Sequence, residues 1–192
     1  MKILAIDTSA VCASVAVTEN GKILSESSIN TGLTHSRTLM PMIDSVLRNG
    51  EIALDSIDTF ACSVGPGSFT GIRIGVAAIK GLCDALVKKC VPVSTLEALA
   101  HNLVGRCCTA VSVMDARCNQ VYTAITITNK GETISKEAQK QIFDRHFSDA
   151  NGSENSMGIG QPLAKAILEK QNGYLTVESE HGETSFVMKY IK

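Results

Sequence analysis

Two short segments of the chain carry residues whose types and spacing suit the binding of a phosphate group. Asp7, Thr8 and Ser9 follow an apolar run at residues 3–6, and a glycine-rich turn spans residues 65–71. Glycine lets the backbone approach a ligand closely, and the free N–H groups at the start of a helix attract anions. The residues of this candidate nucleotide site are Asp7, Thr8, Ser9, Gly65, Gly67 and Ser68.

The glycine-rich turn also has a purely structural interpretation. It joins residues 59–64, an apolar run that predicts a buried strand, to residues 71–86, whose apolar side chains recur at helical spacing. At such a junction, Ser68 or Thr70 can cap the first free N–H groups of the helix. At this stage an anion site and a capped tight turn are both open.

Three strands precede the turn and must position Asp7. Residues 3–6 are apolar, residues 11–18 alternate apolar and polar side chains, and residues 23–29 follow the turn signal Asn20-Gly21. An Asp at the tip of the first strand resembles the start of the phosphate and metal site in the actin, hexokinase and Hsp70 class of ATPases. The glycine usual in that turn is absent here, so a structural role for Asp7 and Thr8 is equally open.

A first helix is expected at residues 34–48, ended by Asn49-Gly50. Pro41 falls inside it and is expected to kink or break it. His35, beside a capping Thr34, could act as a base or could simply be a surface or capping residue. After the second helix, a short buried strand at 91–93, a helix at 96–104 and a hairpin of strands at 109–114 and 121–128 are predicted.

The second helix has two distinct sets of side chains. Its larger apolar residues should face the sheet: Ile72, Val76, Ile79 and Leu86. Its small residues would let another helix approach closely: Gly75, Ala77, Ala78 and Gly81, fringed by the charged Arg73, Lys80 and Asp84. The approaching helix could belong to a partner or be the first helix of the same chain.

Composition excludes several classes of function. Lys plus Arg number 18 against 19 for Asp plus Glu, so direct binding to the phosphate backbone of nucleic acid is not expected. No signal peptide or membrane span is expected, which predicts a cytoplasmic protein. The 7 cysteines show no metal-ligand spacing and fall mostly in apolar runs, which predicts buried reduced thiols, with no metal and no cofactor.

A series of segments, in order and in register, resembles the TsaB (YeaZ) family over residues 1–128. They are Asp7-Thr8-Ser9, His35-Ser36, residues 65–75, 80–82 and 94–100, Asp115-Ala116-Arg117 and Val121-Tyr122. The resemblance implies an actin-like (ribonuclease H-like) α/β fold of two lobes with a degenerate nucleotide site. It also implies a non-catalytic subunit of the bacterial complex that makes threonylcarbamoyladenosine in tRNA.

Members of this family pair through the helices of the first lobe, either with themselves or with the catalytic TsaD subunit. The partner-binding residues that the resemblance implies are His35, Leu39, Arg73, Gly75, Val76, Ala77, Lys80 and Gly81. Contact with tRNA would then be indirect, through the complex.

From Asn129 onward the chain instead resembles the last half of a histidine-kinase ATPase domain. The segments that carry this resemblance are residues 131–137, 142–147, 158–160, 165–169, 173–179 and 182–186. Helices at 137–147 and 162–171, a polar lid-like loop at 148–157 and a hairpin at 174–190 are predicted. The Asp of the adenine-binding box is missing from Asn129-Lys130-Gly131-Glu132-Thr133, so a working kinase is not expected.

These observations predict an actin-like lobe at residues 1–110, the first hairpin of an incomplete second lobe at 111–128 and a kinase-like tail at 129–192. The predicted function is a non-catalytic dimerisation or scaffold subunit in tRNA modification. The alternative is a degenerate ATP-binding or sensor-kinase-like protein that uses the tail. A third hypothesis is a marginally folded chain, because the sequence does not specify whether tail and hairpin match in register.

Overall fold

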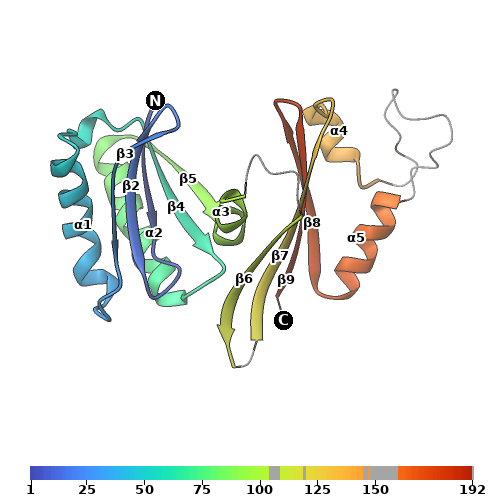
Figure 1. Cartoon of the computed structure of the whole chain (residues 1–192), viewed down its shortest axis with the longest axis horizontal. Helices are drawn as coiled ribbons and strands as arrows, with labels where there is room; N and C mark the ends of the chain where they lie inside the picture. The colour runs from blue at the N-terminus through green and yellow to red at the C-terminus, as the bar shows by residue number, and fades with distance from the viewer. Residues whose placement is uncertain (104–108, 119, 145–146, 148–159, 192) are drawn as a thin grey trace. The chain divides into compact units, whose positions relative to one another are not determined.

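The computed structural model describes residues 1–103, 109–118, 120–144, 147 and 160–191. The chain divides into two compact units, Met1–Ala98 and Leu99–Lys192 (Figure 1). Each unit has a sheet of its own. The predicted loop at 148–157 lies outside the described residues.

The first unit has a five-stranded sheet in the order β3-β2-β1-β4-β5. Its strands are β1 (Lys2–Asp7), β2 (Ala13–Glu19), β3 (Lys22–Ile29), β4 (Thr59–Gly65) and β5 (Lys89–Ser94). The first three strands are antiparallel, whereas β4 and β5 run parallel to β1. Asn20 and Gly21, both at positive φ, form the two-residue turn between β2 and β3, as predicted.

Two helices cover this sheet. α1 (His35–Asn49) packs on β2 and β3, and α2 (Phe69–Leu86) packs on β4 and β5; the helices also contact each other. A short 3₁₀ helix, η1 (Leu54–Ser56), lies between α1 and β4. The predicted break at Pro41 is wrong, since α1 continues through it.

The core of the first unit lies between these helices and the sheet. Leu4, Val17, Val46, Phe60 and Ile79 are completely buried. Each large apolar side chain buried in this way contributes about 1.5–3 kcal/mol to the free energy of folding. The core thus fixes the ends of β1, β4 and α2, which carry the candidate site.

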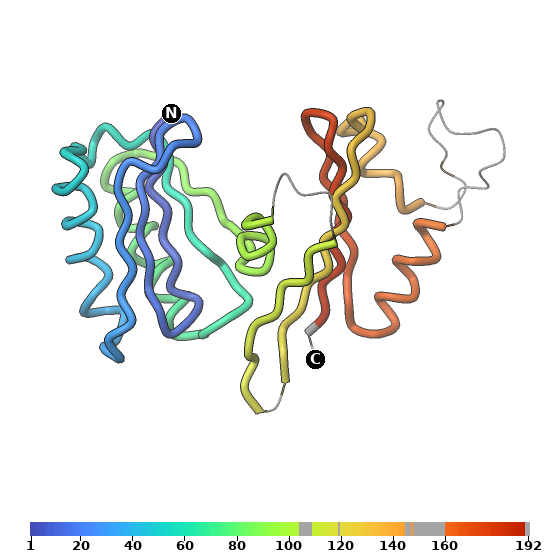
Figure 2. The backbone as a smooth tube through the Cα atoms, viewed as in Figure 1, coloured from blue at the N-terminus to red at the C-terminus, as the bar shows by residue number. Residues whose placement is uncertain are grey.

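The second unit contains a four-stranded antiparallel sheet in the order β6-β7-β9-β8. Its elements are β6 (Thr109–Arg117), β7 (Gln120–Lys130), α4 (Lys136–Gln141), α5 (Gly160–Lys170), β8 (Gly173–Glu180) and β9 (Glu183–Ile191); α3 (Thr95–His101) spans the division between the units. Figure 2 shows β7 and β9 side by side. They pair from Tyr122↔Ile191 to Lys130↔Glu183.

This pairing answers the question of register. The C-terminal hairpin continues the sheet that the β6–β7 hairpin begins, and β7 runs without interruption across position 129. α4 and α5 pack on β8, and Leu168, Leu175 and Val187 are buried. Residues on both sides of position 129 therefore share one sheet.

Several predicted elements differ from the observed ones. β2 begins at Ala13, so Val11 lies outside it with 71% of its surface exposed. α3 ends at His101, and α4 ends at Gln141 although a helix was predicted to residue 147. The expected buried strand at 91–93 is instead the exposed edge strand β5, because none of the described strands pairs with its outer side.

Candidate functional site

Asp7 lies where the first parallel pair of strands ends. β1 and β4 pair in parallel up to Ile6↔Cys62, which brings Asp7 beside Ser63. Oδ1 of Asp7 accepts a hydrogen bond from the Ser63 hydroxyl at 2.6 Å and another from the Ser9 backbone N–H at 2.8 Å. One carboxylate oxygen therefore closes the turn after β1 and joins it to β4.

The same turn is hydrogen-bonded to the start of α2. The Thr8 hydroxyl donates to the Gly71 carbonyl at 2.8 Å, and the Ser68 N–H donates to the Ser9 carbonyl at 2.6 Å. Ser68 caps the helix, accepting from the Gly71 N–H at 3.3 Å. Ser68 is one of the two residues predicted to cap this helix. The capping bond supports the structural interpretation of the glycine-rich turn.

Two glycines make this close approach possible. A Cβ atom at Gly67 would collide with the Ser9 carbonyl, and one at Gly71 would collide with the Thr8 carbonyl. Gly67, at φ +152°, and Gly65, at φ +109°, also adopt backbone conformations that L side chains rarely take. The glycines are therefore explained by contacts within the unit.

The structure thus brings all six residues of the candidate nucleotide site together where β1 and β4 end and α2 begins. Two N–H groups at the start of α2, those of Ser68 and Gly71, are already bonded to protein oxygens. The buried Ser9 hydroxyl has no hydrogen-bond partner among the described residues. Binding of a nucleotide at this end of β1 and β4 stays a prediction.

His35 connects α1 to the same turn. Its Nε2 lies 2.9 Å from the carbonyl oxygen of Ala10, and the ring is half-buried. Because a carbonyl only accepts, Nε2 carries the proton in this contact. Thr34 occupies the N-cap position but makes no side-chain capping bond, so His35 anchors the beginning of α1.

The residues of the implied partner surface divide into two groups. Leu39 and Gly75 are buried and Val76 is half-buried against the core, so these three face the interior of their own unit. A Cβ atom at Gly75 would collide with the Thr8 hydroxyl. The expectation of an open packing face is therefore wrong at Gly75, whose close neighbour is the turn after β1.

The other predicted residues of α2 are exposed. They are Arg73, Ala77, Lys80 and Gly81. Their spacing places them on one side of the helix, and a Cβ atom at Gly81 would meet nothing within 4 Å. The guanidinium of Arg73 also lies 5.2 Å from the ring centre of Phe69, which is 75% exposed.

A groove of about 530 Å³ lies between α1, α2 and the connection after α1. Its lining is mostly apolar and comprises Met40, Ile43, Asp44, Leu47, Arg48, Glu51, Ile52, Ala53, Leu54 and Leu82. Met40 is 47% exposed, and Arg48 pairs with Asp44 at 3.0 Å. The opening of this groove toward Leu82 depends on how the two helices pack.

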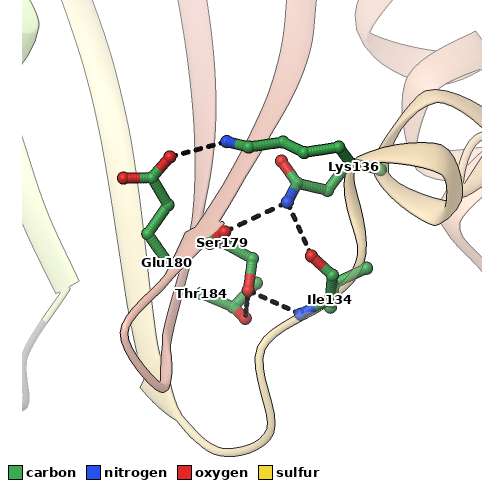
Figure 3. A network of polar contacts seen from close by, with 6 residues as sticks. Ile134, Lys136, Ser179, Glu180 and Thr184 are labelled. Carbon is green, nitrogen blue, oxygen red and sulfur yellow. Dashed lines mark hydrogen bonds and ion pairs between the residues drawn. The ribbon is translucent and has the colours of Figure 1, made fainter.

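In the second unit, a polar network joins α4 to the β8–β9 hairpin (Figure 3). The buried Ser179 hydroxyl accepts from the Ile134 N–H at 2.9 Å and lies 2.8 Å from the Thr184 hydroxyl. Gln139 Nε2 donates to the carbonyls of Ile134 and Ser179. This network was not predicted, because its residues belong to separate elements.

Lys136 and Glu180 add an ion pair at 2.6 Å beside this network. Their hydrogen bond raises the pKa of Lys136 and lowers that of Glu180. Both side chains are exposed, so solvent screens the pair and its contribution to stability is small.

Within the described ranges, no cluster of three or more His, Cys, Asp or Glu side chains could hold a metal ion. No helix in that part of the chain is both long enough and apolar enough to cross a bilayer.

Comparison with known proteins gives three consistent matches. The family model for tRNA N6-adenosine threonylcarbamoyltransferase (TsaD) matches residues 23–179. The tRNA threonylcarbamoyladenosine biosynthesis protein TsaB of Escherichia coli is 32% identical over 94% of this chain and 80% of its own length. The solved structure of YeaZ from Pseudomonas aeruginosa superposes with a TM-score of 0.59 at 32% identity, covering 66% of this chain and 60% of that one.

The length covered differs among relatives. The TsaB protein of Haemophilus influenzae is 34% identical over 68% of this chain, but the alignment spans only 56% of its own length. The heme sensor protein HssS of Staphylococcus saprophyticus is 41% identical over 35% of this chain and 15% of its own length.

The match to YeaZ shows that the first unit has the predicted actin-like, ribonuclease H-like fold. The TsaD-family match extends past position 128.

Proposed function

Because the chain belongs to the TsaB family of tRNA threonylcarbamoyladenosine biosynthesis proteins, we propose that it is a non-catalytic scaffold subunit in the formation of that modified nucleoside. It pairs with a TsaD-like catalytic subunit or with a second copy of itself. It reaches tRNA only through that complex and acts in the cytoplasm.

One observation carries the pairing: the exposed face of α2 is free of bulky side chains at its centre. Ala77 and Gly81 lie there one turn apart, with the charged Arg73 one turn before Ala77 and Lys80 next to Gly81. Small residues allow two helix backbones to approach closely, and the flanking charges can select a partner and its orientation. The neighbouring groove adds apolar surface at Met40.

The polar residues at the end of β1 support the non-catalytic role. Asp7 already accepts two hydrogen bonds through one oxygen, and Thr8 donates to Gly71. These groups hold the turn against α2, a structural role that requires no substrate.

Pairing is tested by an arginine placed on the small-residue face. Ala77→Arg should weaken association with the partner at least tenfold, because a long charged side chain blocks close approach of the helices. Ala166→Arg is the matched control, since Ala166 is also an exposed helical alanine but lies in α5. Light scattering after size exclusion and titration with a TsaD-like subunit provide the measurements.

Wild-type affinity in both Ala77→Arg and Gly81→Arg would remove this face from the proposed interface. Absence of any dimer or TsaD complex with the wild-type chain would remove the scaffold function itself. The chain's role in the modification is measured separately by reconstituting threonylcarbamoyladenosine formation with and without it.

The resemblance of residues 129–192 to the last half of a histidine-kinase ATPase domain favours a second candidate, nucleotide binding by this part of the chain. The candidate contact is Gly160 at the start of α5, where a Cβ atom would meet no atom of the described residues within 4 Å. Titration with ATP and magnesium tests this function: saturable binding that Gly160→Ala weakens and Asp7→Ala leaves unchanged would support it. No binding at millimolar ATP would eliminate it.

A further inference from the structure

Three cysteine thiols gather near the edge of the first sheet. Cys62 is on β4, Cys90 is on the edge strand β5, and Cys83 is on the overlying helix α2. The sulfur atoms of Cys62 and Cys90 lie 3.9 Å apart. The register pairs Phe60 with Cys90 and Cys62 with Pro92, so the two cysteines are diagonal neighbours on the same face of the sheet.

The three thiols differ in their access to solvent. Cys62 and Cys83 are 3% and 7% exposed, whereas Cys90 is exposed. Burial, followed by the influence of Cys90, raises the pKa of Cys62 to about 12. A dissolved electrophile therefore meets Cys90 first, and Cys62 is placed to react only with a group already carried by Cys90.

We propose that Cys62 and Cys90 form a reversible disulfide by exchange with a small-molecule disulfide such as oxidised glutathione. The disulfide is independent of the scaffold function and would make the thiol pair a redox-sensitive cross-link between β4 and β5.

The exchange proceeds in two balanced steps. The Cys90 thiolate attacks one sulfur of oxidised glutathione, the glutathione S–S bond breaks, and one glutathione leaves and takes up a proton. The Cys62 sulfur then attacks Cys90 Sγ in the mixed disulfide, the mixed S–S bond breaks, and the proton of the Cys62 thiol passes to the departing sulfur, so that the second glutathione leaves as a thiol. The two protein thiols are oxidised, and one glutathione disulfide is reduced to two thiols.

The new bond would hold the edge strand to the sheet. The covalent loop from Cys62 to Cys90 encloses all of α2, and closing such a loop restricts the unfolded chain more than the folded one. The oxidised protein should therefore unfold at a higher temperature than the reduced protein.

Peptide mapping of the full chain tests the proposal. The folded protein is incubated with oxidised glutathione, its free thiols are alkylated, and it is digested with trypsin. The three cysteines fall in separate tryptic peptides, residues 49–73 for Cys62, 81–88 for Cys83 and 90–106 for Cys90. The expected product is peptide 49–73 cross-linked to peptide 90–106, with a mass two hydrogens below their sum and lost on reduction.

Two variants make the result decisive. Cys90→Ser changes an exposed side chain and should abolish the cross-link and the rise in melting temperature, whereas Cys83→Ser should retain both. A cross-link between peptides 81–88 and 90–106 would overturn the assignment in favour of Cys83. Glutathione retained on Cys90 with Cys62 fully alkylated after unfolding would overturn the disulfide altogether.

Discussion

Thr8 and Gly71 hold the turn after β1 against the first turn of α2. The Thr8 hydroxyl donates to the Gly71 carbonyl at 2.8 Å, and Gly71 has no side chain to displace the Thr8 carbonyl. The contact links residues far apart in the sequence, so it forms only when strand and helix are both in place. It accounts for a glycine in a helix, where glycine is otherwise unfavourable.

Replacing Gly71 with alanine should destabilise the first unit. The added Cβ atom would collide with the Thr8 carbonyl, and overpacking of this kind costs about 1–3 kcal/mol. Gly81→Ala is the control in the same helix, because its Cβ atom would enter open space; it should raise stability by ~0.5–1 kcal/mol through helix propensity. Urea unfolding followed by circular dichroism measures both, and equal effects of the two substitutions would contradict the described contact.

Asp7→Ala should lower stability in the absence of any nucleotide. The substitution removes the oxygen that accepts from Ser63 and Ser9, and hydrogen bonds to a charged group contribute about 1.5–3 kcal/mol each. Asp84→Ala, on the exposed side of α2, should change stability by less than about 0.5 kcal/mol. If the urea midpoint of unfolding is the same for Asp7→Ala and the wild type, the carboxylate has no structural role, and its presence would need another explanation.

Much of the first unit could be predicted because its signals are local. Asn20-Gly21 specifies a hairpin turn, and the spacing of apolar residues in 71–86 specifies a helix. The contact that buries Gly75 could not be predicted, because it depends on which side of α2 meets Thr8. Helical spacing grouped the larger apolar residues correctly at Ile79, which is completely buried, but it did not place Gly75 on the buried side of α2 as well.

The second unit shows a different limit. The strands of both hairpins were predicted from alternation and turn residues, but nothing local specifies that Thr126 pairs with Val187. The same limit applies to β5, where Val91 and Val93 resemble a buried strand although β5 is an edge. Burial of a strand depends on its neighbours in the sheet, which lie elsewhere in the sequence.

Stability should decrease at alkaline pH through Cys62. Its pKa is about 12 in the folded protein against an ordinary value of 9.0, mainly because burial disfavours the thiolate. The unfolded chain therefore releases this proton first, so the contribution to stability is complete below pH 9 and is lost as pH rises toward 12.

The check on Cys62 compares the pH dependence of the unfolding free energy in the wild type and in Cys62→Ala, both under reducing conditions. Unfolding free energies from urea titrations at pH 8, 9, 10 and 11 should decline more steeply for the wild type, because only it carries this thiol. Parallel declines would show that Cys62 ionises equally readily in both states. Lysine and tyrosine residues titrate in the same range in both proteins, so their effect cancels in the difference.

Ser179→Ala should destabilise the second unit, because the Ser179 hydroxyl joins β8 to β9 and to the segment that precedes α4. Its loss leaves the Ile134 N–H and the buried Thr184 hydroxyl without this partner, at a cost of about 1–3 kcal/mol for an unsatisfied buried group. Thr176→Ala, an exposed change in the same strand, should cost less than about 1 kcal/mol. Hydrogen exchange separates the two units: faster exchange at Ile134 and Ala138 with unchanged exchange in β1 and β4 is expected for Ser179→Ala. Unchanged exchange at Ile134 would show that the connection between α4 and the β8–β9 hairpin is held by Gln139 and the Lys136–Glu180 pair instead.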